Sequence, residues 1–188
     1  PAGLSTAFFL RRRGHVCEVM ESLDSPGGQI REKIDEGSLP GHIVDGEIAR
    51  LEEMGAVIRL GRKLGRDFDL SEIAADFDAV VLATGNRTGE LLEKLGLETN
   101  GNTLRVDKMT GKTSMEKVFA AGAAAGSRGT AVLDIASGKK TAEFVDLYLR
   151  GGTELPPRRL DVKTRKLAED EVRELMKGVD LFARQEPS

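Results

Sequence analysis

Short apolar runs and segments with helical periodicity alternate along most of this chain, and that alternation constrains the fold more than any other feature. Four runs have the apolar content of buried strands, at 16–20, 56–60, 78–85 and 117–122. Four segments place apolar residues at helical spacing, at 4–13, 42–55, 69–77 and 129–152. This order is typical of helices that connect neighbouring parallel strands. We therefore predict an α/β fold with a mostly parallel sheet.

Glycine, proline and serine refine this prediction at two places. The stretch 22–41 is rich in Gly, Pro and polar residues and is predicted to be loop. The long helix at 129–152 contains Ser137-Gly138, which we expect to interrupt it.

Residues 153–188 differ in character from the rest of the chain. Pro156-Pro157 exclude helix at that point. A final helix is predicted from Lys163 to Lys177, with a thin apolar stripe formed by Leu167, Val172, Leu175 and Met176. We therefore expect a domain over 1–152, followed by a linker and a C-terminal helical tail that packs on the domain or leads to a further module.

The composition excludes several classes of partner. The 188-residue chain has a formal net charge of -3, 4% aromatic residues and no Trp, and no block of like charge forms a nucleic-acid footprint. The run Arg11–Arg13 is interpreted as the solvated end of a helix rather than a binding patch. No apolar stretch is long enough to span a membrane and no signal peptide is evident, so we expect a cytoplasmic protein.

Cysteine and histidine are too few for metal or disulfide chemistry within the chain. Cys17, the single cysteine, excludes an internal disulfide and a cysteine-held iron–sulfur cluster, and its place in a predicted strand indicates a small buried residue. His15 and His42 have no cysteine partners to complete a metal site. His15, at the turn into a strand, is interpreted as structural. No nucleophile paired with a base is evident, so no catalytic residue is assigned.

The chain opens with Pro1-Ala2-Gly3, a turn of small residues that leads into a helix, and the strand after that helix ends on Glu21. In the motif G-x-G-x-x-G, glycines between a strand and a helix let the backbone approach a pyrophosphate, and an acid about 20 residues later binds ribose hydroxyls. If Gly3 is the last of these glycines, the first two precede Pro1. The alternative is that Gly3 is a turn residue and Glu21 a solvated strand end.

Longer segments carry a more specific resemblance. They are the opening 22 residues with "PGGQIR" at 26–31, "FDAVVLATG" at 77–85, "TSMEKVFAAG" at 113–122 and the helix within 129–151. In this order they resemble the FAD-binding half of pyridine nucleotide-disulfide oxidoreductases. The resemblance is strongest to the branch of the glutamate synthase small subunit and related NAD(P)H-dependent iron–sulfur flavoproteins. It implies a Rossmann-like, three-layer FAD/NAD(P)-binding fold with a mostly parallel sheet.

The resemblance implies roles for five residues on the adenosine and pyrophosphate side of FAD. Gly3 would pack beside the pyrophosphate, and Glu21 would hold the adenosine ribose. Leu64 would offer its backbone to the adenine, while Thr84 and Gly85 would border the pyrophosphate. Strand ends and helix starts are where this class of fold contacts a dinucleotide.

Further residues are implied on the flavin side. Gly28 and Gln29 would lie along the cofactor, and Gly122 and Ala123 would lie beside the ribityl chain. The N-terminus of the long last helix would face the flavin ring through Thr130, Ala131 and Val132. Its partial positive charge would stabilise a reduced, anionic flavin.

Three departures from the family pattern bear on cofactor binding. Ala123 stands where the family usually has an aspartate that binds a ribityl hydroxyl, a contact worth roughly 0.5–1.5 kcal/mol. The turn that would supply most pyrophosphate donors precedes Pro1, so we expect an N-terminally truncated domain. The family's inserted NAD(P)H domain is missing between about 86 and 112, because Gly85 and Thr113 are too close for a domain to fit. NAD(P)H is therefore expected only in the parent protein.

Two functions stay open at this point. The first is the FAD-binding domain of a flavin-dependent oxidoreductase, which transfers electrons between NAD(P)H and an iron–sulfur or other acceptor in a larger protein. An iron–sulfur domain or subunit is the partner this implies. The second is a non-catalytic scaffold or interaction module, descended from such a domain, that no longer binds FAD. This chain alone is expected to be inactive, and the sequence leaves its oligomeric state open.

Overall fold

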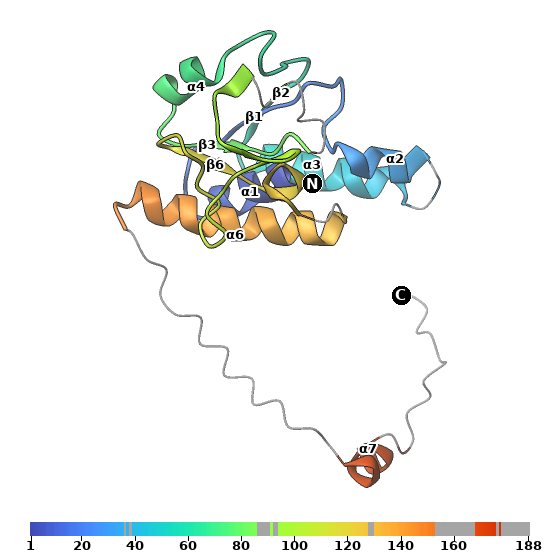
Figure 1. The fold of residues 1–188 in the computed structure, drawn as a ribbon. Helices are drawn as coiled ribbons and strands as arrows, with labels where there is room; N and C mark the ends of the chain where they lie inside the picture. Colours follow the sequence, from blue (N-terminus) through green and yellow to red (C-terminus); the bar gives the residue numbers. More distant parts are fainter. Residues whose placement is uncertain are drawn as a thin grey trace. The chain divides into compact units, whose positions relative to one another are not determined.

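A computed structural model describes residues 1–35, 37, 39–85, 91, 94–127, 130–152, 168–175 and 177. The chain divides into two compact units, Pro1–Leu155 and Pro156–Ser188, and each is described by itself (Figure 1). In the second unit the described residues form helix α7 (Glu169–Leu175). The predicted linker at 153–162 and two residues of the predicted stripe, Leu167 and Met176, lie outside the described residues.

Two parallel strand pairs form the centre of the first unit. β1 (Glu18–Met20) pairs with β2 (Val57–Arg59), and β3 (Val80–Leu82) pairs with β6 (Val118–Ala120). The third ladder among the described residues is an antiparallel hairpin of β4 (Thr99–Asn100) and β5 (Thr103–Leu104). The predicted α/β fold with mostly parallel strands is confirmed.

The helices lie where the sequence predicts them, with one addition. α1, α3, α4 and α6 span Ala2–Arg11, Gly41–Glu53, Leu70–Asp76 and Ala131–Leu149. α2 (Gln29–Asp35) lies inside the stretch predicted as loop, so that prediction was wrong. The Gly and Pro residues flank a run of good helix formers, and Arg31 of α2 pairs with Asp45 of α3 at 2.7 Å. Within the described part of the chain, no helix has the length and apolar content to cross a membrane.

α6 is continuous through Ser137-Gly138, so the predicted interruption was also wrong. A Cβ on Gly138 would lie 2.3 Å from the carbonyl oxygen of Ala2, because α1 crosses α6 at this point. At the crossing, Ser5 Oγ donates to a carbonyl of α6 at 2.9 Å and Thr6 Oγ1 donates to that of Gly138 at 3.2 Å. In Figure 1, α1 (dark blue) lies beside α6 (orange), and the two helices are in contact. The glycine is therefore explained by the close helix contact and does not end the helix.

Alternate side chains of β6 enter two apolar clusters on opposite faces of the sheet. Val118 and Ala120 lie in one cluster with Leu82 of β3 and Leu104 of β5. Phe119 lies in the other, with residues of α1, α3 and α6. Because successive side chains of a strand point to opposite faces, the parallel strands form the middle of three layers, as the fold prediction requires.

The basic run 11–13 is not the solvated face that the sequence predicts. Arg12 is exposed, but Arg11 is half-buried and donates to two carbonyl oxygens, that of Met54 at 2.8 Å and that of His15 at 2.7 Å. Helix ends leave carbonyl groups without intrahelical partners, and Met54 is the residue at which α3 ends. Arg11 therefore joins the ends of α1 and α3, a role that depends on tertiary contacts.

Cys17 is the small buried residue that the sequence predicts. It lies one residue before β1 and is 9% exposed. Burial raises the pKa of its thiol, although Arg11 acts in the opposite direction. A thiol with a raised pKa is a poor nucleophile at neutral pH, which agrees with the interpretation of Cys17 as part of the core.

Candidate functional site

Five of the twelve predicted site residues follow the carboxyl ends of strands. Glu21 follows β1, Thr84 and Gly85 follow β3, and Gly122 and Ala123 follow β6. β3 and β6 run parallel, so the segments that follow them leave the sheet at the same edge. In open parallel sheets, ligands bind at this carboxyl edge. This edge is therefore the candidate site.

Helix α1 begins at the same edge, in close contact with two of these segments. A Cβ on Gly3 would lie 3.2 Å from the Cβ of Ala83, and a Cβ on Gly122 would lie 2.7 Å from the Cβ of Ala2. Gly122 also has a φ of 67°, a conformation that favours glycine. The start of α1 is thus brought against the segments after β3 and β6, the arrangement in which a dinucleotide-binding turn needs glycine.

α6 begins beside Gly122 as well. Thr130 caps the helix, and its Oγ1 accepts the Leu133 N–H at 3.3 Å. Ser137, in the second turn, accepts the Gly122 N–H at 2.9 Å. Val132 is 75% exposed at this end of the helix. Since the first N–H groups of a helix carry a partial positive charge, the edge receives the positive ends of both α1 and α6.

Of the remaining predicted residues, Gly28 joins this group. It has a φ of 56°, and a Cβ there would lie 3.9 Å from Cδ of Pro1. Gln29 follows it as the first residue of α2. Leu64 is different, since it packs against the apolar cluster around β3 and β6 and forms a bridge with Phe68. Its contact with an adenine stays a prediction.

Glu21 is oriented by local hydrogen bonds. Its Oε1 accepts the Leu23 N–H at 3.0 Å and the Ser22 hydroxyl at 3.3 Å. Asp134 also lies near the start of α1, because a Cβ on Gly122 would lie 2.7 Å from the Cβ of Ala2 and 3.4 Å from Oδ1 of Asp134. The sequence predicts no role for Asp134.

Three buried polar atoms find no hydrogen-bond partner among the described residues. They are Thr84 Oγ1, Ser127 Oγ and Asp134 Oδ1. A buried polar atom left unpaired costs about 1–3 kcal/mol, so such atoms are uncommon and often mark a missing ligand or water. Thr84 was predicted from the sequence. Ser127 and Asp134 were missed because only their burial, which the sequence does not show, distinguishes them.

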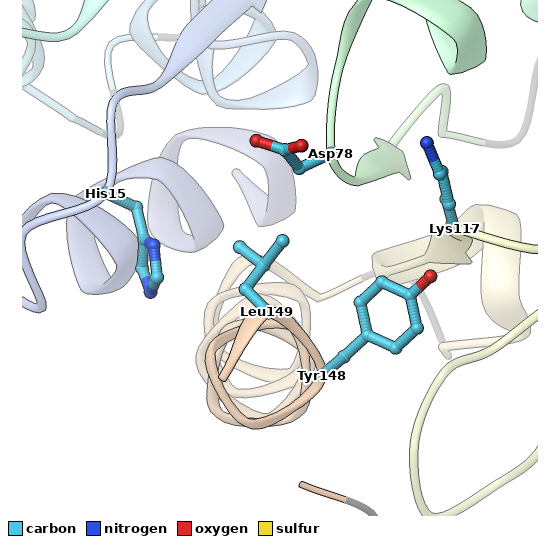
Figure 2. A pocket seen from close by; sticks show the side chains of 5 residues that line it. All are labelled: His15, Asp78, Lys117, Tyr148 and Leu149. Carbon is cyan, nitrogen blue, oxygen red and sulfur yellow. The ribbon is translucent and has the colours of Figure 1, made fainter. Parts of the chain in front are cut away.

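A separate pocket lies at the opposite end of the strands (Figure 2). Its lining residues are His15, Asp78, Lys117, Tyr148 and Leu149, and its volume is about 610 Å³. Asp78 and Lys117 come just before β3 and β6, at the amino ends of these strands. The pocket therefore lies away from the carboxyl edge, and the sequence predicts no ligand contact for the residues that line it.

His15 in this pocket is structural, as predicted. Its Nε2 lies 2.7 Å from Oδ1 of Asp146, which also pairs with Arg150 at 2.8 Å and, through Oδ2, with Arg13 at 3.4 Å. Burial raises the pKa of Asp146, but hydrogen bonds with His15 and Arg150 outweigh burial and hold that pKa below its usual value. No group of three or more metal-ligating side chains occurs in the described ranges.

Comparison with protein families and solved structures agrees with this geometry. Residues 1–60, which contain α1 to β2, match the family described as NAD(P)-binding Rossmann-like domain. A thioredoxin reductase from Gloeobacter violaceus has a similar structure, with a TM-score of 0.51 and 13% identity, over 84% of this chain and 95% of that one. At this identity the likeness shows the fold alone, and it confirms the Rossmann-like prediction.

Curated relatives give a narrower likeness. The glutamate synthase [NADPH] small chain of Mycobacterium tuberculosis is 37% identical over 101 residues, which are 54% of this chain and 21% of that protein. The NADP(+)-dependent formate dehydrogenase subunit beta of Moorella thermoacetica is 38% identical over 85 residues, 45% of this chain and 12% of that protein. The NAD-dependent dihydropyrimidine dehydrogenase subunit PreT of Escherichia coli is 34% identical over 89 residues, 47% of this chain and 22% of that protein.

The chain thus spans less than a quarter of the length of each of these relatives. The likeness to the glutamate synthase small chain was predicted from the motifs and is confirmed by the measured identity. Family match, relatives and fold agree with one another. Residues 1–60 are similar to the NAD(P)-binding Rossmann-like domain, and about half of the chain is similar to part of the glutamate synthase small chain, PreT and the formate dehydrogenase beta subunit.

Proposed function

We propose that residues 1–152 are the FAD-binding domain of a flavin-dependent oxidoreductase that transfers electrons between NAD(P)H and an iron–sulfur or other acceptor in a larger protein. The relatives support this proposal, because their names describe NADPH-, NADP- and NAD-dependent enzymes. Two of them are named as subunits, which supports a separate subunit as the acceptor.

The observation that carries the proposal is the meeting of four chain segments at one sheet edge. These are the starts of α1 and α6 and the segments after β3 and β6. Gly122, after β6, contacts both helices, and Gly3 of α1 contacts Ala83, after β3. Two of the unpaired buried atoms, Thr84 Oγ1 and Asp134 Oδ1, belong to these segments. FAD has phosphate and hydroxyl groups that would pair with such atoms. The residues present therefore fit this cofactor.

Different parts of the edge would hold different parts of FAD. N–H groups at the start of α1 would donate to the pyrophosphate, where the positive end of a helix stabilises negative charge. The Glu21 carboxylate would accept ribose hydroxyls. The start of α6 would lie beside the flavin ring, and the ring would cover the exposed side chain of Val132. Bound FAD supplies the redox chemistry, and the protein binds and orients it.

We also propose that the NAD(P)H domain, which the family carries as an insertion, is missing between about residues 86 and 112. Residues 153–188 would then form a linker and a helical tail. The chain between β3 and β6 contains the hairpin β4–β5, whose Leu104 is 2% exposed within the core cluster. The hairpin is therefore part of the core of the first unit and does not form a separate domain. NAD(P)H would then bind to another part of the larger protein.

The second candidate, a scaffold that no longer binds FAD, is favoured by Ala123. Its side chain is 3% exposed and has no polar atom, at the position where the resemblance places an aspartate. On this alternative, the glycines and helix ends at the edge would be retained for packing alone. The unpaired buried atoms argue against it, because packing alone gives no reason to keep them.

The visible absorption spectrum separates the two candidates. The purified chain is measured before and after incubation with excess FAD and removal of the free flavin. Flavin bands that stay with the protein would support the first candidate, and a colourless protein would support the scaffold. We expect NAD(P)H not to bleach the bound flavin, and rapid bleaching would contradict the absence of a nicotinamide site.

A further inference from the structure

Asp134 is a buried acid without a hydrogen-bond partner on one of its oxygens. It lies in the first turn of α6, is 4% exposed, and its Oδ1 is unpaired among the described residues. A Cβ on Gly122 would lie 3.4 Å from this oxygen and 2.7 Å from the Cβ of Ala2. Oδ1 is therefore aimed at the point where the loop after β6 meets the start of α1.

The contacts of α6 do not explain why an acid is buried here. Thr130 already caps the helix, with its side chain accepting the Leu133 N–H. The positive end of a helix offsets only part of the cost of a buried charge. No ion pair to Asp134 is present among the residues that the structure describes, whereas Asp146 at the other end of α6 has three. Among the described residues, Oδ1 of Asp134 therefore lacks a hydrogen-bond donor.

The chemistry of the edge indicates which donor fits. An ionised carboxylate only accepts hydrogen bonds, so a pyrophosphate, which is anionic and has no donors at neutral pH, would be repelled. The hydroxyl groups of a ribityl chain are donors. They would lie beside Gly122 and Ala123 in the arrangement proposed above, and Ala123 has no side-chain acceptor to offer them.

We propose that Asp134 is a flavin-binding residue that accepts a hydrogen bond from a ribityl hydroxyl, and so supplies the acceptor that Ala123 lacks. This inference rests on the proposed function. Asp134 reaches the hydroxyl from the start of α6, whereas the family's usual acceptor extends from the loop after β6. The same contact would pair Oδ1 of Asp134, the buried carboxylate oxygen that has no partner among the described residues.

The test compares Asp134→Ala and Asp134→Asn with the 188-residue wild-type chain. The matched control is Asp76→Asn, an equal loss of charge at an exposed residue of α4. Binding of FAD is titrated by its fluorescence, and binding of ADP, which has no ribityl chain, is titrated by calorimetry. Because a hydrogen bond to a charged group is worth about 1.5–3 kcal/mol, Asp134→Ala should weaken FAD binding by about tenfold or more. ADP binding and the control should stay unchanged.

Thermal unfolding of the flavin-free proteins is a second readout. If Asp134 serves a ligand, removing its unpaired charge should leave the midpoint of unfolding equal or higher, and a lower midpoint would assign it a structural role instead. Equal FAD affinity in all four proteins would overturn the inference and leave the proposed function standing. Equal weakening of FAD and ADP would also overturn it. A wild-type chain that binds no FAD would overturn both.

Discussion

Replacing Gly138 with alanine should destabilise the first unit, although the same change stabilises most helix interiors. In an open helix, alanine is favoured over glycine by about 0.5–1 kcal/mol, because glycine loses more backbone freedom on folding. At Gly138, the added Cβ would lie 2.3 Å from the carbonyl oxygen of Ala2 and 3.0 Å from the Cβ of Ser5. The first contact is with backbone, so α1 and α6 must move apart.

The expected magnitude follows from what this movement disturbs. Overpacking a close contact costs about 1–3 kcal/mol. The movement also stretches the hydrogen bond from Ser5 Oγ to the Ile135 carbonyl at 2.9 Å, which is worth about 0.5–1.5 kcal/mol. The Thr6 hydroxyl, 3.2 Å from the Gly138 carbonyl, keeps its nearer acceptor, the Ala2 carbonyl at 2.9 Å. After the gain from alanine is subtracted, we expect the free energy of unfolding to fall by about 1–3 kcal/mol.

Urea unfolding followed by circular dichroism measures this change. Gly46 is the matched control, because it lies inside α3, is exposed, and has nothing within 4 Å of a built Cβ. Gly46→Ala should raise the free energy of unfolding by about 0.5–1 kcal/mol. If Gly138→Ala were as stable as the wild type, the close crossing of α1 and α6 would be refuted.

Three further predictions concern other parts of the first unit. Gly122→Ala should unfold more easily than Gly126→Ala, by about 1–3 kcal/mol in chemical denaturation, since both residues have positive φ but only Gly122 has a neighbour where the Cβ would go; equal losses would contradict the close contact with Ala2. The Asp146→Asn variant should have a free energy of unfolding about 1–3 kcal/mol lower than the wild type at neutral pH. Because folding lowers the pKa of Asp146, the ionised carboxylate stabilises the fold above its unfolded pKa, and this stabilisation is lost as pH falls through the folded pKa. The variant should therefore lose less stability on acidification than the wild type, and parallel curves of stability against pH would argue against this. Glu21→Ala should weaken binding of both FAD and ADP by about tenfold in titrations, and unchanged ADP affinity would remove Glu21 from the ribose site.

Much of the fold could be predicted because its signals are local. The apolar runs that become β3 and β6 are followed by Gly85 and Gly122, and these strand ends define the edge of the sheet. Gly3 and Gly122, at this edge, could also be identified from the sequence motifs. Glycine occurs in such motifs where two backbone segments, or a backbone and a ligand, come close together. The sequence was therefore sufficient to predict the parallel strands, while the roles that it assigns to the candidate site residues stay predictions.

The errors share one physical cause, which is that contacts between distant segments outweigh local composition. Gly138 suggests a helix break until α1 is packed against it, and Arg11 suggests a solvated face until Met54 lies beside it. Asp134 was missed for the same reason. An acid in the first turn of a helix is common because it favours the helix dipole, and only burial against Gly122 makes it unusual.

The central claim is that the carboxyl edge between α1 and α6 binds a flavin dinucleotide. The most direct test is a fluorescence titration of FAD into the purified 188-residue chain, repeated in the presence of excess ADP. Our account predicts saturable binding of one FAD per chain, weakened by ADP because both ligands would occupy the pyrophosphate and ribose positions at the edge. A chain that is folded by circular dichroism but leaves the FAD fluorescence unchanged would contradict it.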